Sequence, residues 1–569
     1  MSLQSKVDNF INWIKKSNLD IKPHQLSGIR WCLLREHNIE PIYLQPNMPF
    51  RCPMGGGILG DEMGLGKTIL MIGAIVANPK KRTLIVLPNC LVKQWTNVLN
   101  NLLTDDFPIP LVFHGSKVKS PTILKQIQNN RIVITTYGMI SIRKSKLVKK
   151  KVNHYKCALW DIEWDRIIFD EAHHLRNRHS NVHKGAQLLS SFTKWFVTGT
   201  PIQNHSGDMY SLLSLLNYTQ LLHFGEVETM NAIKAIYLRR TKKSIKSNIV
   251  NCEYQEIPVH YKNEAEKRLA THIHSLCNFS TINVNNVDNI INLLDGKGVF
   301  PIYSAARQVC ILPNMLTNKW IENQVNNIIP WDMDVPQINS SSKIDAIVDT
   351  IKLHKNTGRK IIFAHYHAEI DLIYNKLFNA GIPVCKYDGR ITNKKRHFNA
   401  ASTSGWADMF IYHKNWSNEI VNKAETIKML VEKFLAPTVL IIQIQSGCEG
   451  LNLQHFNEVY FTSPHWNPAV EMQAIARVHR IGQTKPVRVY RFITQFDDDD
   501  TDNPISIDQY ALKVQDVKKT IIDKFNRYAT KSNAPKKRKK RCPNGHTSFS
   551  WNTIGQAIPI GHTKFSIGL

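Results

Sequence analysis

The sequence GGGILGDEMGLGKT at residues 55–68 joins a short apolar run to a glycine-rich turn, and the helix-forming stretch Ile69–Ile75 follows it. Backbone N–H groups of such a turn, together with the start of the following helix, can surround phosphate groups. Lys67 would then reach the β- and γ-phosphates of a nucleotide, and Thr68 would ligate Mg²⁺. The strict form of this motif has glycine where the chain has Asp61, so a merely flexible glycine loop is the alternative interpretation.

A pair of carboxylates follows another apolar run further along the chain. Asp170 and Glu171 come directly after Arg166–Phe169, so both are expected at the carboxyl end of a strand, where open α/β sheets bind their ligands. Asp170 can hold Mg²⁺ through water, and Glu171 can orient and deprotonate an attacking water molecule. The alternative is a capping cluster at a strand–helix junction, and the glycine loop upstream makes that alternative the weaker one.

Two further segments could complete such a site. The stretch Trp195–Asn204 is typical of a strand that ends in a Thr-Gly-Thr-Pro turn, which can sense a γ-phosphate. Gln473, Arg477 and Arg480 are spaced by four and three residues, which predicts that they share one face of a helix. Two arginines facing a cleft suit a transition state with spread negative charge. A surface helix paired with acidic neighbours is the alternative.

Apolar runs of strand length recur in two series. Runs of this kind, ending in loop residues and separated by helix-capable stretches, suit strands buried on both faces of a parallel sheet. The first series predicts strands at 58–59, 83–87, 111–113, 132–135, 166–169 and 195–198, and the second at 360–364, 384–387, 438–442, 458–461 and 487–492. Two α/β lobes, each with its own sheet, are the economical architecture.

Composition narrows the class of protein. The 569 residues are 43% hydrophobic and 21% charged, which is typical of a globular protein with more than one domain. The formal charge of +28 and the pI of about 9.6 favour a polyanion partner such as nucleic acid, with a merely basic protein as the alternative. Ten cysteines lack the spacing of a disulfide framework or a zinc site. Without a signal peptide or a run of ~18 apolar residues, we expect an intracellular protein with no membrane partner.

These motifs together resemble the Swi/Snf-type DNA-dependent ATPases of helicase superfamily two, over about residues 21–495. In its compact length and in the stretch Thr462–Pro468, the chain is also similar to the global transactivator proteins of insect large DNA viruses. The chain departs from the family at Ser463–His465, where many members carry an acidic residue, and in an insertion at 401–424. Other matching segments are Ile21–Gln25, Gly28–Trp31, Leu84–Pro88, Trp95, Thr135–Tyr137, Leu238–Lys242, Asp388–Gly389, Gly447–Leu453 and Trp466–Pro468.

The resemblance implies an α/β fold of two RecA-like parallel-sheet lobes with helical insertions and a basic, disordered C-terminal tail. ATP and Mg²⁺ would lie between the lobes. Gln25 would read the adenine, and the loop around the phosphates would consist of Asp61, Glu62, Met63, Gly64, Leu65, Gly66, Lys67 and Thr68. The expected segments are an N-terminal helix (1–20), lobe one (21–220), a helical insertion and linker (221–340), lobe two (341–500), a C-terminal helix (501–529) and the tail (530–569).

The implied activity is ATP-driven movement along double-stranded DNA that remodels nucleosomes or other DNA-bound proteins and regulates transcription. A strand-separating helicase acting on DNA or RNA keeps every ATPase motif but predicts stimulation by single strands. A DNA-bound regulator without catalysis would leave the motor residues free to decay. The basic run Lys536–Arg541 predicts import into the nucleus, with a clamp on DNA phosphates as its rival. The sequence leaves the oligomeric state open.

Overall fold

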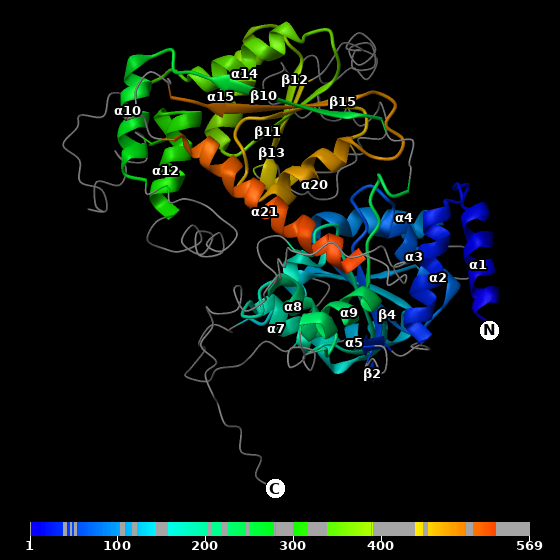
Figure 1. The fold of residues 1–569 in the computed structure, drawn as a ribbon. Coiled ribbons are helices and arrows are strands. Elements are labelled where there is room, and N and C mark those ends of the chain that lie inside the picture. Colours follow the sequence, from blue (N-terminus) through cyan, green and yellow to red (C-terminus); the bar gives the residue numbers. More distant parts are fainter. Residues whose placement is uncertain are drawn as a thin grey trace, which may run out of the picture.

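The structure is a computed structural model with two α/β lobes connected by a linker and by one long helix (Figure 1). The predicted fold class is confirmed. The residues that the structure describes are 2–37, 42–45, 48–50, 54–102, 109–115, 122–143, 157–202, 207–218, 226–245, 250–277, 279, 300–316, 338–388, 390, 439–447, 453–496 and 505–530. The insertion at 401–424, the residues Gly389, Gly450 and Asn452, and the basic tail lie outside these ranges.

Lobe one contains a parallel sheet with the strand order β5-β6-β4-β7-β8-β3-β9 among the described residues. Its strands are β3 (Gly55–Leu59), β4 (Thr83–Leu87), β5 (Leu111–Phe113), β6 (Ile132–Thr136), β7 (Glu163–Asp170), β8 (Ser190–Val197) and β9 (Tyr237–Leu238). Its helices are α1 (Leu3–Lys16), α2 (Pro23–His37), α3 (Lys67–Ala77), α4 (Val92–Leu102), α5 (Ile123–Asn129), α6 (Tyr137–Ile140), α7 (Asn181–Gln187), α8 (Gly207–Leu215) and α9 (Glu226–Ile236).

Lobe two contains a second parallel sheet, with the order β10-β15-β14-β11-β13-β12 in the described part of the chain. Its strands are β10 (Cys252–Val259), β11 (Lys360–Ala364), β12 (Val384–Tyr387), β13 (Val439–Gln443), β14 (Glu458–Phe461) and β15 (Val487–Thr494). Its helices are α10 (Glu264–Ser275), α12 (Phe300–Ile311), α14 (Ser342–Leu353), α15 (His367–Asn379), α19 (Ile444–Gly447), α20 (Pro468–Val478) and α21 (Ile507–Thr530).

Each sheet separates two hydrophobic cores, because successive side chains of a strand point to opposite faces. In β4, Leu84 and Val86 pack in the core under α5–α9, whereas Ile85 and Leu87 pack in the core under α1–α4. The same alternation divides lobe two, where α14 and α15 cover one face of the sheet and α20 the other. Both lobes are therefore three-layered, and the loops at the carboxyl ends of their strands are left available for ligands.

The segment 221–340, expected to be a helical insertion and linker, also supplies a strand to each sheet. β9 pairs with β3 at the edge of lobe one, and β10 pairs with β15 at the edge of lobe two. A short antiparallel hairpin of β1 (Ile42–Gln45) and β2 (Met48–Phe50) was also not foreseen. None of the described helices is long and apolar enough to cross a membrane.

Helix α21 crosses from lobe two to lobe one (Figure 1). Its early residues Ile507, Tyr510 and Val514 lie in a cluster with α10 and α12, while Phe525 lies in the core of lobe one. The two lobes therefore share one helix in addition to the linker between β9 and β10.

Candidate nucleotide site between the lobes

The glycine loop follows β3 and ends at the first residue of α3. Gly64 and Gly66 have φ angles of 87° and 82°, a left-handed conformation that residues with a Cβ adopt rarely. Gly66 is the N-cap of α3 and has no side chain with which to cap the helix. The first N–H groups of α3 are therefore left for an anion, and the loop fits the phosphates of a nucleotide.

Gln25, on α2, lies against this loop. A Cβ added at Gly66 would come within 2.7 Å of Gln25 Nε2, so the end of this side chain lies directly against the loop. The neighbouring His24 places its Nε2 atom 3.1 Å from the carbonyl oxygen of Leu65. The start of α2 is thus packed beside the phosphate loop, where the sequence predicted the reader of the base.

Lys67 opens α3 and points back into the loop. Its Nζ donates a hydrogen bond of 2.9 Å to the carbonyl oxygen of Asp61. Burial lowers the pKa of Lys67, and the carboxylates of Glu171, Asp61 and Asp170 act against that shift. The ammonium group therefore lies in the electrostatic field of the acid pair. Thr68 follows Lys67 in the first turn of α3.

Asp170 is the last residue of β7 and is fixed by two donors. Trp95 Nε1 donates to Oδ2 at 2.7 Å, and the backbone N–H of Glu171 donates to Oδ1 at 2.9 Å. Burial and the adjacent Glu171 raise the pKa of Asp170 above its usual range. Each carboxylate oxygen can accept a further hydrogen bond, so the oriented group fits a water-mediated contact with Mg²⁺. Trp95 was noted in the sequence only as a matching residue, and the structure gives it this orienting role.

Glu171 is the first residue after β7 and adopts a left-handed backbone conformation with φ of 49°. His173 Nδ1 lies 3.3 Å from Glu171 Oε2, and Arg477 Nη2, from lobe two, lies 3.8 Å from Oε1. Burial alone would raise the pKa of Glu171, but His173, Arg477 and Lys67 together lower it. The carboxylate is therefore ionised at neutral pH, in contact with the second lobe.

The two arginines both belong to lobe two but lie in different local structures. Arg477 lies in the last turn of α20, as expected, but the helix ends at Val478 and Arg480 follows it in a bend. The predicted helix through Arg480 is therefore wrong. A Cβ on Gly64 would lie 3.6 Å from Arg480 Cα, so the bend packs directly on the phosphate loop. Burial and the nearby Arg477 lower the pKa of Arg480 to about 10.

Gln473 shares α20 with Arg477 but is 3% exposed. Its Nε2 atom has no hydrogen-bond partner among the described residues. The structure therefore buries this side chain in lobe two.

An anchor for the phosphate loop comes from the residues after β9, and the sequence did not reveal it. Arg240 donates to Asp61 from its backbone N–H and from Nε, both at 2.9 Å, and Arg240 Nη2 also pairs with Asp61. Arg239 Nη1 donates to the carbonyl oxygens of Gly60 (2.9 Å) and Gly199 (3.1 Å). Asp61 is 1% exposed, and its side chain makes these contacts with Arg240 inside the loop.

Lys242 joins the same loop to lobe two. Its backbone N–H donates to Glu62 Oε2 at 2.8 Å, and its Nζ donates to the carbonyl oxygen of His479 at 2.7 Å. His479 stands between the two arginines in sequence. Lys242 is thus a contact between the phosphate loop and the arginine segment, and long-range pairing of this kind leaves no local signal in a sequence.

The Thr-Gly-Thr-Pro turn after β8 also lies against the phosphate loop. A Cβ on Gly199 would come within 2.6 Å of Met63 Cγ and 3.3 Å of Lys67 Nζ. The turn therefore touches both the loop and its lysine. Leu65 is buried at the base of the loop. The structure brings the predicted loop, acid pair, turn and arginines to one place at the interface of the lobes.

Comparison with known proteins shows which families and relatives the chain is similar to. The SNF2-related domain matches residues 24–315, and the helicase conserved C-terminal domain matches residues 422–482. A probable global transactivator of Orgyia pseudotsugata multicapsid polyhedrosis virus is 28% identical over 536 residues, which cover 89% of this chain and 91% of that protein. The DNA repair protein rad8 of Schizosaccharomyces pombe is 24% identical over 621 residues, which cover 85% of this chain and 53% of the relative.

Human chromodomain-helicase-DNA-binding protein 6 is 25% identical over 528 residues, covering 84% of this chain and 17% of that protein. The chain thus spans most of the viral relative and about half or less of these two cellular relatives. Among solved structures, the Sulfolobus solfataricus SWI2/SNF2 ATPase core in complex with dsDNA is 21% identical, with a TM-score of 0.35, and the match covers 84% of this chain and 88% of that one. Because the SNF2-related domain matches just over half of its residues, the chain belongs to the SNF2-related family of helicase-superfamily ATPases.

Proposed function

We propose that the chain is an ATP-driven double-stranded DNA translocase that remodels protein–DNA complexes and regulates transcription. The observation that carries the ATPase part is the contact of Arg477 with Glu171, at 3.8 Å, across the two lobes. One lobe supplies the phosphate loop and the acid pair, while the other supplies the arginines. A site divided in this way is complete only when the lobes are together, which couples hydrolysis to lobe movement.

The roles of the residues follow from their surroundings. Lys67 and the N–H groups of α3 would hold the β- and γ-phosphates of ATP, and Gln25 would meet the base. Thr68 and Asp170 would hold Mg²⁺, which supplies charge neutralisation on the phosphates when bound. Glu171, kept ionised by its cationic neighbours, would orient the attacking water and accept its proton. Arg477 and Arg480 would stabilise the charge that spreads over the transferred phosphoryl group.

Three observations support DNA as the polymer. The formal charge of +28 gives the chain a field that attracts polyanions. The relatives include a transactivator, a DNA repair protein and a chromodomain-helicase-DNA-binding protein. In the sequence, the Trp466–Pro468 block and the arginine segment resemble those of the Swi/Snf type, which argues against a strand-separating helicase. Nucleosomes or other DNA-bound proteins are the proposed obstacles.

The test is steady-state ATPase activity without nucleic acid and with duplex DNA, single-stranded DNA or RNA. The wild type is compared with Glu171→Gln, whose amide cannot accept the proton of water, and with the matched control Glu163→Gln. Glu163 starts the same strand and is exposed. We expect duplex DNA to stimulate the wild type and the control strongly, whereas Glu171→Gln binds ATP without hydrolysing it.

The other outcomes identify the alternatives. Stimulation mainly by single-stranded DNA or RNA would replace the translocase with a strand-separating helicase. Absence of turnover that depends on Glu171 would leave a non-catalytic DNA-bound regulator.

We further propose that the tail segment Lys536–Arg541 directs the chain to the nucleus. The run has six consecutive basic residues after a proline. Fluorescent fusions of the whole chain, with and without six alanines in place of this run, test the proposal. Equal nuclear accumulation of both fusions would contradict it, and weaker duplex-DNA binding with unchanged localisation would indicate the phosphate clamp instead.

A further inference from the structure

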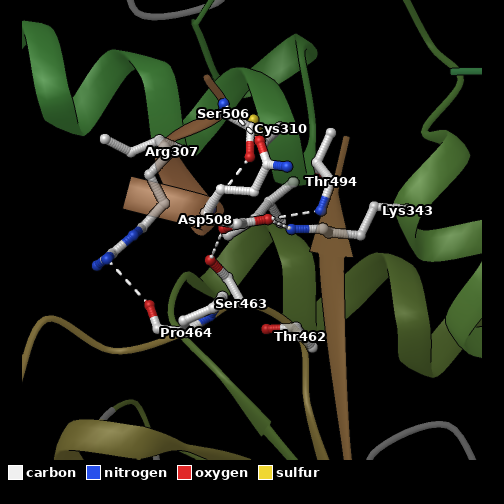
Figure 2. Close-up of polar contacts among 12 residues, drawn as sticks. Arg307, Cys310, Lys343, Thr462, Ser463, Pro464, Thr494, Ser506 and Asp508 are labelled. Atoms are coloured by element: carbon white, nitrogen blue, oxygen red, sulfur yellow. Dashed lines mark hydrogen bonds and ion pairs between the residues drawn. The ribbon is translucent and has the colours of Figure 1, made fainter. Parts of the chain in front are cut away.

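The loop that leads into the arginine helix is held by other segments of the chain (Figure 2). This loop, residues 462–467, joins β14 to α20. Arg307 Nη2, from α12, donates to the carbonyl oxygen of Pro464 at 3.0 Å, and the Arg307 guanidinium lies 4.7 Å from the ring centroid of Trp466. Ser463 Oγ donates to Asp508 Oδ1 at 2.5 Å. The position of α20 therefore depends on partners that are distant in sequence.

Asp508 lies at the centre of these contacts (Figure 2). It is in the first turn of α21, is 1% exposed, and accepts from Ser463 Oγ, from Lys343 Nζ and from the backbone N–H of Thr494 at 3.0 Å. Lys343, on α14, is also 1% exposed. Burial alone would raise the pKa of Asp508, and Lys343 with the other donors lowers it. The carboxylate of Asp508 thus joins loop 462–467 to α14, to the end of β15 and to α21.

The next turns of α21 hold the remainder of the same loop. Gln515 Nε2 donates to the carbonyl oxygen of His465 at 2.6 Å and to Glu471 Oε1 at 2.7 Å. Lys518 Nζ donates to the carbonyl oxygen of Trp466 at 3.2 Å. Since Glu471 is in the first turn of α20, α21 contacts both the loop and the helix that presents Arg477.

The far end of α21 reaches the strand edge beside the phosphate loop. Phe525 packs on Tyr237, with ring centroids 6.1 Å apart, and the Tyr237 hydroxyl donates to Asn526 Oδ1 at 3.2 Å. A Cβ on Gly60 would come within 2.1 Å of the Tyr237 ring, so Tyr237 lies directly against the start of the loop. One helix therefore touches the supports of the arginines at one end and of the phosphate loop at the other.

We propose that α21 is a positioning element that sets the arginines relative to the phosphate loop, with Asp508 as its positioning residue. The inference rests on the proposed ATPase function and deepens it. Asp508 touches no reacting group. It acts by fixing loop 462–467, and thus the start of α20, while the Phe525 end fixes the helix to lobe one. A displacement of the arginines by about 1 Å is enough to lower turnover about a hundredfold.

The first measurement separates turnover from nucleotide binding. Asp508→Asn and the milder Ser463→Ala are compared with Asp516→Asn, which alters an exposed aspartate of the same helix that pairs with Lys519 at 3.2 Å. We expect both test variants to lower kcat, by about tenfold to a hundredfold, and to bind a fluorescent ATP analogue as the wild type does. The control should keep its kcat. Wild-type kcat in Asp508→Asn and Ser463→Ala would overturn the proposal.

A paired variant distinguishes positioning from stability. Asp508→Leu combined with Lys343→Met removes both buried charges, so no ion is left unpaired and the fold is expected to remain stable. The hydrogen bonds to Ser463 and to the backbone of Thr494 are still lost. We expect the melting temperature of the paired variant to return from the lowered value of Asp508→Asn towards that of the wild type. Its kcat should nevertheless stay about tenfold or more below wild type. Full recovery of kcat would show that Asp508 serves only to compensate Lys343.

A second readout needs no activity. Amide hydrogen exchange of residues 462–478 should become faster in Asp508→Asn and in Ser463→Ala, but not in Asp516→Asn, with the exchange of α3 unchanged in all three. Unchanged exchange in 462–478 would overturn the inference even if turnover fell. If the wild type has no ATPase activity, the proposed function fails, and the exchange data still decide whether α21 fixes the arginine helix.

Discussion

The Arg240→Ala variant tests whether Asp61 is an anchor and not a ligand. Asp61 is 1% exposed and takes its side-chain partners from Arg240, whose own side chain is 13% exposed. Arg240→Ala leaves this carboxylate buried with the backbone N–H of residue 240 as its remaining Arg240 contact. Removing one partner of a buried ion pair costs about 3–5 kcal/mol. In the free protein the loop can move so that Asp61 becomes hydrated, which avoids this cost. Nucleotide binding must then return the loop to its place, so the same free energy is subtracted from the binding free energy.

At about 1.4 kcal/mol for each factor of ten, the dissociation constant for a fluorescent ATP analogue should rise by about two hundredfold to a few thousandfold. Equilibrium titration measures this rise, with Arg30→Ala on the exposed side of α2 as the matched control. Asp61→Asn combined with Arg240→Leu should recover much of the affinity, because no buried charge remains unpaired. Wild-type affinity in Arg240→Ala would refute the anchor.

Three further predictions concern other parts of the protein. Arg480→Ala, and separately Arg477→Ala, should lower kcat about a thousandfold with duplex DNA present, and a normal rate would remove that arginine from the transition state. Phe525 is buried in the core of lobe one, so Phe525→Ala should lower the free energy of unfolding by about 3–5 kcal/mol. Denaturant titration measures this loss, and a value below about 1 kcal/mol would contradict the packing. Burial lowers the pKa of His274 to about 4, below its unfolded value of about 6.5, so this residue should contribute a fall in stability of about 1.4 kcal/mol per pH unit as the pH drops from 6.5 towards 4. The neutral ring accepts from the N–H of Ile507 at 3.1 Å and protonation removes that acceptor, so His274→Gln should show a shallower slope, and equal slopes would exclude His274 as the cause.

The parts of the fold that the sequence predicted are those with a local pattern. Runs such as Thr83–Leu87 are apolar throughout because both faces of the strand are buried, and they were found. β10 was missed because it is an edge strand with mostly exposed, polar residues, and β9 because it has two residues. Neither carries the apolar run that distinguishes a buried strand.

The candidate site likewise has a part that a local sequence pattern predicts and a part that depends on long-range contacts. The glycine loop and the acid pair could be predicted because each is a contiguous motif with a defined chemistry. The helix through Arg480 was wrong because the chain turns after Val478, where Gly482 takes a φ of 98° and Lys242 binds the carbonyl of His479. The pairing of Asp61 with Arg240 spans 179 positions, and spacing in a single sequence does not encode such a contact.

That separation of 179 positions also has a consequence for biosynthesis. A ribosome adding about 5–20 residues per second makes the phosphate loop roughly ten to forty seconds before its anchor. For most of that interval β3 also lacks β8, and β9 is made only at its end, so a strand of glycines has little tendency to order without these neighbours. We therefore expect a nascent chain to become able to capture ATP only once residues beyond Lys242 have left the ribosome. A released fragment that ends at Ile236 and binds the nucleotide as tightly as the full chain would disprove this order of events.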